Sequence, residues 1–248
     1  MKGARAAVVT GAQGGIGVAL CKAFKEAGYY TVGIDISEAD QDICDAAIRA
    51  DLNAAAEDAE RGRRLLDEVR TAVGERDLAV LVNNAAVQIL KASDELALAE
   101  FRESLNVNLL APFILSQGLL DLLEASSGAI INIGSIHARL TKPGFVAYAT
   151  SKAALEGMTR AMAVDLGSKV RVNAIAPAAI ETEMLKAGFE GDQGGYDALM
   201  ECHPVGRIGE VSEVAEAALF LASDRAGFIN GSVFSIDGGI SARLHDPR

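Results

Sequence analysis

Short apolar runs alternate with segments of helical periodicity from one end of the chain to the other. The runs are rich in Val, Ile and Leu, as expected of strands buried on both faces of a sheet. They predict strands at 6–10, 30–35, 48–52, 78–82, 129–133, 170–175 and 232–236, of which 48–52 is the weakest. The segments between them space apolar residues as on one face of a helix. These predict helices over 16–27, 57–73, 98–124, 147–166 and 211–222.

Strands that alternate with helices favour parallel pairing, because a parallel connection needs a crossover long enough to hold a helix. We therefore expect an α/β fold: a doubly wound (Rossmann) parallel sheet of about seven strands, with helices on both faces. No linker or repeat interrupts the alternation, so residues 1–248 are expected to form a single domain. The least regular stretch, Glu181–Pro204, holds four glycines and predicts a substrate loop. It is either a mobile lid or a tolerant surface loop.

Composition narrows the function classes. The 248 residues include 34 acidic and 23 basic side chains, a net charge of −11, which argues against nucleic-acid or anionic-membrane partners. Cys21, Cys44 and Cys202 lack metal-ligand spacing, so we expect reduced thiols and no metal site. No apolar run approaches the ~18 residues that cross a bilayer, and the first run is too short for a secretory signal. A cytoplasmic protein is expected.

A glycine-rich loop follows the first predicted strand and opens the first predicted helix. It reads TGAQGGIG and holds Gly11, Gln13, Gly15, Ile16 and Gly17. Glycines at such a turn let the backbone approach a pyrophosphate, which then meets the free N–H groups of the helix N-terminus. A glycine cluster alone is weak, since loops collect glycine for turn geometry. The strand–loop–helix context is what favours dinucleotide binding.

Asp35 ends the second predicted strand, 18 residues beyond Gly17. A carboxylate there can accept hydrogen bonds from the adenosine ribose hydroxyls and would repel a 2′-phosphate. No Lys or Arg stands in the glycine loop or directly after Asp35 to neutralise such a phosphate. The cofactor expected from these residues is NAD rather than NADP.

Tyr148 and Lys152 are four residues apart at the start of a predicted helix and so share one face. Ser135 follows the strand 129–133, at the end where open α/β sheets place their ligand crevice. A tyrosine hydroxyl is a poor base at neutral pH, but a nearby ammonium and the positive nicotinamide ring of NAD⁺ favour its phenolate. Tyr148 could then take the proton of an alcohol while hydride leaves, and Ser135 could hold the substrate oxygen.

Several further motifs stand in order along the chain, and together the set resembles the short-chain dehydrogenase/reductase family over essentially its whole length. The motifs are Asp35, DL at 51–52, NNAA at 83–86, NVNLLAPF at 106–113, INIGS at 131–135, YATSK at 148–152, RVNAIAPAAIET at 171–182 and IDGG at 236–239.

The resemblance implies a role for each matching position. Ser135, Tyr148 and Lys152 match the family's active-site residues, and Lys152 would also hold the nicotinamide ribose. Asn108, rather than its neighbour Asn106, matches a fourth active-site position that holds a water linking the lysine to solvent. The remaining cofactor contacts implied are Asp51, Leu52, Asn84, Ala85, Ile180 and Thr182. His137 follows Ser135 with Arg139 and Lys142 in a segment that borders the family's substrate pocket and could meet an anionic substrate, although a solvated loop is the more ordinary explanation. Gln88 is also a candidate for this pocket.

The expected function is NAD-dependent hydride transfer between nicotinamide and a secondary alcohol or ketone, a small-molecule substrate. The alternatives are a catalytically idle NAD-binding sensor or scaffold and an NADP-linked ketoacyl or carbonyl reductase. Two related enzyme classes fit the sequence less well. Enoyl reductases have more residues between the Tyr and the Lys than this chain has, and sugar-nucleotide epimerases have a larger C-terminal portion. The apolar helices 98–124 and 147–166 match those that pair between subunits in the family, which implies a homotetramer or homodimer.

Overall fold

The computed structural model describes residues 3–38 and 42–244, and these form one seven-stranded sheet. All neighbouring strands pair in parallel, in the order β3-β2-β1-β4-β5-β6-β7. The strands are β1 (Arg5–Thr10), β2 (Tyr30–Asp35), β3 (Ala46–Arg49), β4 (Asp77–Asn83), β5 (Ala129–Ile133), β6 (Arg171–Pro177) and β7 (Val233–Ile236). The predicted doubly wound sheet is confirmed. Because the order reverses between β1 and β4, a crevice opens at their carboxyl ends.

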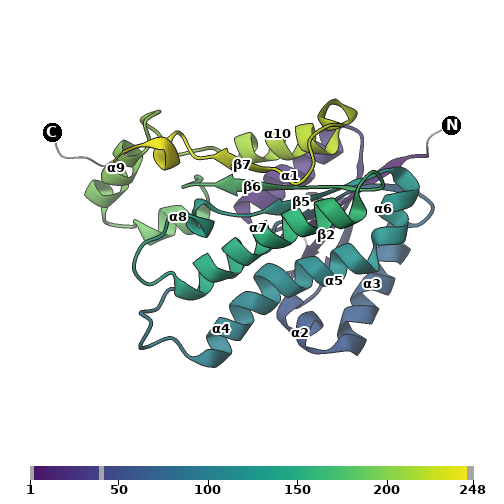
Figure 1. Cartoon of the computed structure of the whole chain (residues 1–248), viewed down its shortest axis with the longest axis horizontal. Helices are drawn as coiled ribbons and strands as arrows, with labels where there is room; N and C mark the ends of the chain where they lie inside the picture. The colour runs from purple at the N-terminus through teal and green to yellow at the C-terminus, as the bar shows by residue number, and fades with distance from the viewer. Residues whose placement is uncertain (1–2, 39–41, 245–248) are drawn as a thin grey trace.

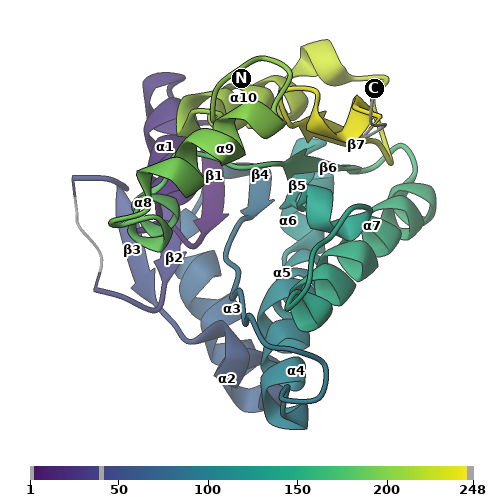
Figure 2. The same ribbon diagram turned by 90° about the vertical axis from the view of Figure 1, so that its left-hand side faces the viewer.

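Helices cover both faces of the sheet (Figure 1, Figure 2). On one face lie α1 (Gly15–Glu26) and α10 (Val211–Ala222), which pack against each other. The other face carries α2 (Leu52–Glu57), α3 (Ala59–Val73), α5 (Ala111–Gly118), α6 (Leu120–Ser126) and α7 (Val146–Leu166). Two separate apolar layers result, one on each side of the strands. The continuous apolar runs of the sequence are explained by this double cover.

The helix predicted over residues 98–124 is broken. It consists of α4 (Leu98–Leu105), a π-helical turn (Asn106–Leu110), α5 and α6, with a bend of 59° after Gly118. Within the π turn the N–H of Ala111 donates to the carbonyl of Asn106, five residues back. Pro112 has no N–H to offer the carbonyl of Asn108, four residues back. The proline explains why the regular ladder fails here.

Two boundaries near the adenosine side also differ from expectation. The third strand ends at Arg49 rather than at Leu52, and Leu52 instead begins α2. The carboxylate of Asp51 caps α2 by accepting from the N–H groups of Asn53 and Ala54. Asp58 ends α2 and caps α3 in the same way, so the helix predicted over 57–73 is split. In both cases an Asp N-cap overrides the apolar pattern.

The stretch Glu181–Pro204, predicted as an irregular substrate loop, is mostly helical. It contains α8 (Glu183–Gly188) and α9 (Gln193–Cys202), capped by Thr182 and Asp192. Both helices lie at the carboxyl ends of the strands (Figure 2). The segment therefore covers the crevice as a pair of short helices rather than as an open loop.

Two of the three cysteines lie together inside the molecule. The Sγ atoms of Cys21 on α1 and Cys44 before β3 are 3.1 Å apart, and both side chains are buried. The contact with Cys44, together with burial, raises the pKa of the Cys21 thiol. Cys202, in contrast, is partly exposed at the end of α9.

Within the described ranges, 3–38 and 42–244, no single helix is long and apolar enough to cross a membrane. The two helical segments Leu98–Gly118 and Leu120–Ser126, taken together across their bend, would be long and apolar enough by length and composition alone. The same residues contain no group of three or more His, Cys, Asp and Glu side chains placed to hold a metal ion.

Candidate active site

The glycine loop connects β1 to α1 at the crevice. Gly14 precedes the first turn of α1, and no side chain caps that turn. The first N–H groups of a helix have no intrahelical partner, so those of α1 are available to an anion at its N-terminus.

Three glycines keep this loop compact. Gly11 has a φ of +65°, and a Cβ there would lie 2.8 Å from the Cα of Ala85. A Cβ on Gly17 would fall 1.8 Å from the carbonyl oxygen of Gly11, and one on Gly15 would fall 2.9 Å from the methyl group of Thr182. A side chain at Gly11 or Gly17 would have to displace backbone, and one at Gly15 would have to displace the Thr182 side chain. The loop therefore presents bare backbone to the crevice, as the binding of a dinucleotide pyrophosphate requires.

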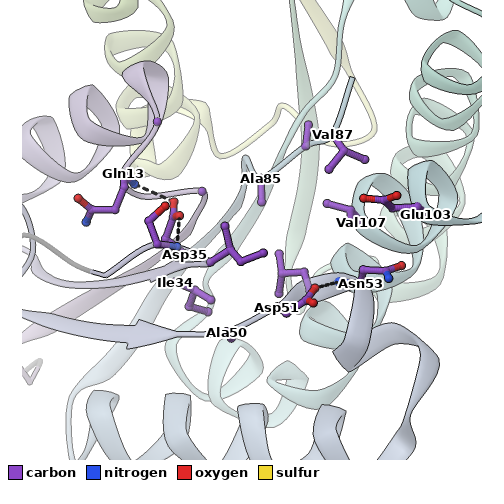
Figure 3. A pocket seen from close by; sticks show the side chains of 16 residues that line it. Gln13, Ile34, Asp35, Ala50, Asp51, Asn53, Ala85, Val87, Glu103 and Val107 are labelled. Atoms are coloured by element: carbon purple, nitrogen blue, oxygen red, sulfur yellow. Dashed lines mark hydrogen bonds between the residues drawn. The ribbon is translucent and has the colours of Figure 1, made fainter. Parts of the chain in front are cut away.

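A cavity of about 420 Å³ continues from the glycine loop along the ends of β2 and β3 (Figure 3). It brings together the predicted residues Gly11, Gln13, Asp35, Asp51, Leu52 and Ala85. Glu103 and Val107, from α4 and the π turn, also line it and were not predicted. The spacing of Glu103 and Val107, four apart on one helical face, was the available signal. No lysine or arginine is among the described residues that line this cavity, so its carboxylates share the wall with no cation there.

The Asp35 carboxylate accepts two hydrogen bonds from the backbone. One carboxylate oxygen accepts from the backbone N–H of Gln13 and the other from that of Ser37, each at 2.9 Å (Figure 3). Asp35 thus links the end of β2 to the glycine loop. Asn84 makes a similar link, since its Nδ2 donates to the carbonyl oxygens of Thr10 and Gly11. The two residues hold the cofactor crevice in shape from opposite sides.

Ser135, Tyr148 and Lys152 converge on a second cavity, of about 430 Å³, which meets the first at Ala86. Ser135 follows β5, while Tyr148 and Lys152 are one turn apart in α7. Ile16, Asn84, Ile180 and Thr182 line the same cavity. Lys152 is 2% exposed, and its Nζ donates to the carbonyl of Ile133 at 2.7 Å.

Burial is the largest influence on the pKa values of Tyr148 and Lys152. It lowers the pKa of Lys152 to about 8, because the ammonium loses its water. The pKa of Tyr148 is raised by burial, and a hydrogen bond from Ser135 opposes this only in part. The ammonium lies 5.7 Å from the Tyr148 ring centre. In the chain alone the phenol is therefore not acidified, contrary to what the ammonium by itself would suggest.

Asn108 lies in the π turn, fully buried. Its amide accepts from the N–H of Val87 and donates to the carbonyl of Val87, each at 2.9 Å, and it also donates to Ser151. Asn106 faces elsewhere, since its amide donates to Asn53 and Glu57 of α2. Of the two asparagines, Asn108 is the one joined to α7 and to the loop after β4.

The substrate side opens beyond Tyr148 into a third cavity of about 650 Å³. Gln88 and His137 line both this cavity and the second one, so both predicted pocket residues lie at the junction. The His137 ring stacks on Phe145 with centres 4.2 Å apart, and its edge faces Tyr148. Further lining residues were not predicted as site residues: Phe145, Leu185, Phe189, Leu199, Cys202, His203 and Arg243.

With this geometry in view, comparison with known proteins decides the family. Residues 11–241 match the family model described as "Enoyl-(Acyl carrier protein) reductase". D-threitol dehydrogenase of Mycolicibacterium smegmatis is 34% identical over 247 residues, covering 96% of this chain and 94% of that protein. The chain belongs to the short-chain dehydrogenase/reductase family. It is accordingly an oxidoreductase of the kind that acts on CH–OH donors.

Solved short-chain dehydrogenases share the fold closely. Gluconate 5-dehydrogenase of Burkholderia cenocepacia, in complex with NADP and tartrate, superimposes with a TM-score of 0.84 at 30% identity, covering 98% of this chain and 97% of that one. 4-Hydroxyisoleucine dehydrogenase complexed with NADH gives 0.83 at 29% identity, covering 96% and 100%. Structures similar to this chain thus hold either nicotinamide dinucleotide.

Proposed function

We propose that the protein is an NAD-dependent dehydrogenase of a secondary alcohol/ketone pair, with Tyr148 as general acid/base. The observation that carries this proposal is the convergence of Ser135, Tyr148 and Lys152 on one cavity next to a dinucleotide crevice. Relatives named as polyol dehydrogenases, such as that for D-threitol, support an alcohol or sugar-alcohol substrate.

Tyr148 takes the hydroxyl proton of the alcohol in the oxidative direction and returns it to the alkoxide in reduction. NAD⁺, when bound, would supply the hydride acceptor and a positive ring charge near Tyr148. That charge is what would offset the burial that raises the pKa of Tyr148. Ser135, already bonded to the phenol, is placed to hydrogen-bond the substrate oxygen and keep it in line.

Lys152 and Asn108 complete the proton path. The Lys152 ammonium, held on the carbonyl of Ile133, lies beside Tyr148 and can pass a proton from it. The backbone carbonyl of Asn108 has no N–H at Pro112 to bond, so it can hold the water that joins Lys152 to solvent. The side chain of Asn108 is occupied with Val87 and Ser151, which fixes that carbonyl in place.

The cofactor would lie across the first two cavities. Its pyrophosphate would meet Gly11, Gln13, Gly15, Ile16 and Gly17; its adenosine Asp35, Asp51, Leu52, Asn84 and Ala85; and its nicotinamide riboside Tyr148, Lys152, Ile180 and Thr182. The acidic adenosine wall supports NAD over NADP, because a 2′-phosphate would face Asp35 and Asp51. Some similar structures hold NADP, so the preference depends on these side chains and not on the fold.

The 248 residues are proposed to work as one NAD(P)-binding domain in the cytoplasm, assembled as a homotetramer or homodimer. Apolar side chains on the outer surface of α5 and α7 support assembly: Phe113 is 40% exposed, and Val146 and Val164 are 40% and 81% exposed. Sedimentation of the purified protein as a monomer would contradict this part of the proposal.

The experiment is nicotinamide absorbance with NAD⁺ and NADP⁺ in parallel, over secondary alcohols that include sugar alcohols. Turnover is expected with NAD⁺, and Tyr148→Phe should lower kcat by about 10²–10⁴-fold while NAD⁺ still binds. Preserved turnover in Tyr148→Phe would overturn the mechanism. NAD⁺ binding with no turnover on any alcohol would favour the idle sensor.

A further inference from the structure

The catalytic cavity and the 650 Å³ cavity beyond it have a wall chemistry unlike that of the rest of the chain. The sequence carries 34 acidic residues against 23 basic ones. None of the described residues lining these two cavities is Asp or Glu, whereas the adenosine cavity has Asp35, Asp51 and Glu103. Carboxylates are thus present at the cofactor's adenosine end and absent from the described wall where the substrate would lie.

The same wall carries positive charge. Lys142 lines both cavities, and Arg243 lines the outer one. Lys142 lies 5.0 Å from the Phe145 ring centre, and its charge helps burial to lower the pKa of His137. Neighbouring rings place this charge close to the reacting group, because Phe145 and His137 both contact the ring of Tyr148.

Neither cation is neutralised by the described part of the chain. Lys142 forms no ion pair there, in contrast to Lys91, Lys169 and Lys186. Arg243 donates to the backbone carbonyl of Glu201 and to no carboxylate among the described residues. A free cation in a concave, partly apolar wall attracts an anion more strongly than one on an open surface.

We propose that this wall selects a hydroxy-acid substrate, with the reacting carbinol held between Ser135 and Tyr148 and the carboxylate directed to Lys142 and Arg243. The inference rests on the proposed dehydrogenase function and specifies its substrate class. Neutral sugar alcohols would fill the same space without using either cation. A phosphate monoester would also be attracted to two cations, so alditol phosphates are included in the test to distinguish the two anions.

Matched substrates test the proposal directly. Aldonates of three to six carbons are compared with the alditols of the same chain length and with the alditol phosphates, using NAD⁺ and NADP⁺. The aldonate is expected to show kcat/KM at least about tenfold above its alditol, and a KM that rises with ionic strength. Equal or faster turnover of the alditol, or a preference for the phosphate, would overturn the inference and leave the proposed function standing. No turnover of any compound would overturn both.

Substitutions of Lys142 and Arg243 test whether these two cations cause the preference for the aldonate. Lys142→Glu should reduce aldonate kcat/KM about tenfold more than alditol kcat/KM, mostly through KM, and Lys142→Ala and Arg243→Ala should each give a smaller selective loss. Lys169→Ala is the matched control, because Lys169 pairs with Glu124 in the turn before β6, away from the cavities. It should leave both substrates unchanged. Equal losses on aldonate and alditol in the Lys142 variants would show that Lys142 has only a structural role.

Discussion

The ammonium of Lys152 is bound to the carbonyl of Ile133 at 2.7 Å, fully inside the protein. That contact ties α7, which carries Tyr148, to the end of β5, from which Ser135 follows. A second bond, from the Asn132 amide of β5 to the Thr159 hydroxyl of α7, joins the same two elements, next to the candidate active-site residues. The Lys152 contact also buries a titratable group, which makes the stability of the fold depend on pH.

The first prediction concerns that pH dependence. Burial lowers the pKa of Lys152 to about 8 from an ordinary 10.5. Between these values the unfolded chain binds more protons than the folded one, so the Lys152 contribution to stability rises with pH. The cost of burying the ammonium, about 3 kcal/mol, is fully present below pH ~8 and is relieved towards pH ~10.5.

Denaturant unfolding of the wild type and Lys152→Met across this range checks the prediction. The free energy of unfolding of Lys152→Met minus that of the wild type should fall by up to about 3 kcal/mol as pH rises. A difference that stays constant with pH would mean that Lys152 keeps its ordinary pKa in the fold.

The second prediction separates the two asparagines of the π turn. Asn108→Ala should leave the half-buried N–H and carbonyl of Val87 without their present partners and destabilise the fold by about 2 kcal/mol. It should also reduce turnover at least about tenfold, since the loop after β4 and α7 lose their connection. Asn106→Ala is the control. It removes contacts only to α2, so its turnover should stay within about threefold of the wild type.

The third prediction concerns two glycines of the cofactor loop. Gly17→Ala places a methyl group 1.8 Å from the Gly11 carbonyl oxygen, which forces the loop apart and should cost about 3 kcal/mol or more. Gly14→Ala meets the same oxygen at 3.5 Å, an ordinary contact, and should change stability by no more than about 1 kcal/mol. Thermal melts without cofactor distinguish the two. Similar melting temperatures would show that the loop is not tightly packed at Gly17.

The fourth prediction tests the acidic adenosine wall. Asp35→Asn replaces an acceptor of two backbone N–H groups with an amide that can accept from only one. NAD⁺ kcat/KM should fall about tenfold, and Asp35→Asn with Ile36→Arg should gain NADP⁺ activity, because Ile36 lines the same cavity and is exposed. Fluorescence titration with NADH and NADPH measures the change. An unaltered ratio between the two cofactors would show that Asp35 does not select.

Much of this fold follows from the apolar runs, because a strand covered on both sides must be apolar throughout. Tyr30–Asp35 and Ala129–Ile133 were predicted to the residue. The third strand was misplaced because its only buried side chain is Ile48, so the run 48–52 carried little sheet signal. The break at Asn106–Leu110 could have been anticipated from Pro112, whose missing N–H is a property of the sequence itself.

The two helices of Glu181–Pro204 were missed for a different reason. Glycines lower helix propensity, and Gly194 and Gly195 lie inside α9. The caps were the better signal: the Asp192 side chain accepts from the N–H of Gly195, and Thr182 caps α8 in the same way.

Motif spacing predicted many of the residues that line the first two cavities, but not the wall of the third. Lys142, His203 and Arg243 meet only through folding, from segments about 40 to 100 residues apart, and no local pattern links them.

The arrangement of the three cysteines allows the protein to be labelled at one site. Cys21 and Cys44 are enclosed against each other, so Cys202, on the wall of the outer cavity, is the single thiol that a reagent can reach in the folded protein. A maleimide dye should therefore attach once per chain, at the end of α9, without any engineering. The label would lie on α9, beside the cavity proposed to hold the substrate. Its emission would then report ligand entry in real time, including for compounds that bind without being oxidised.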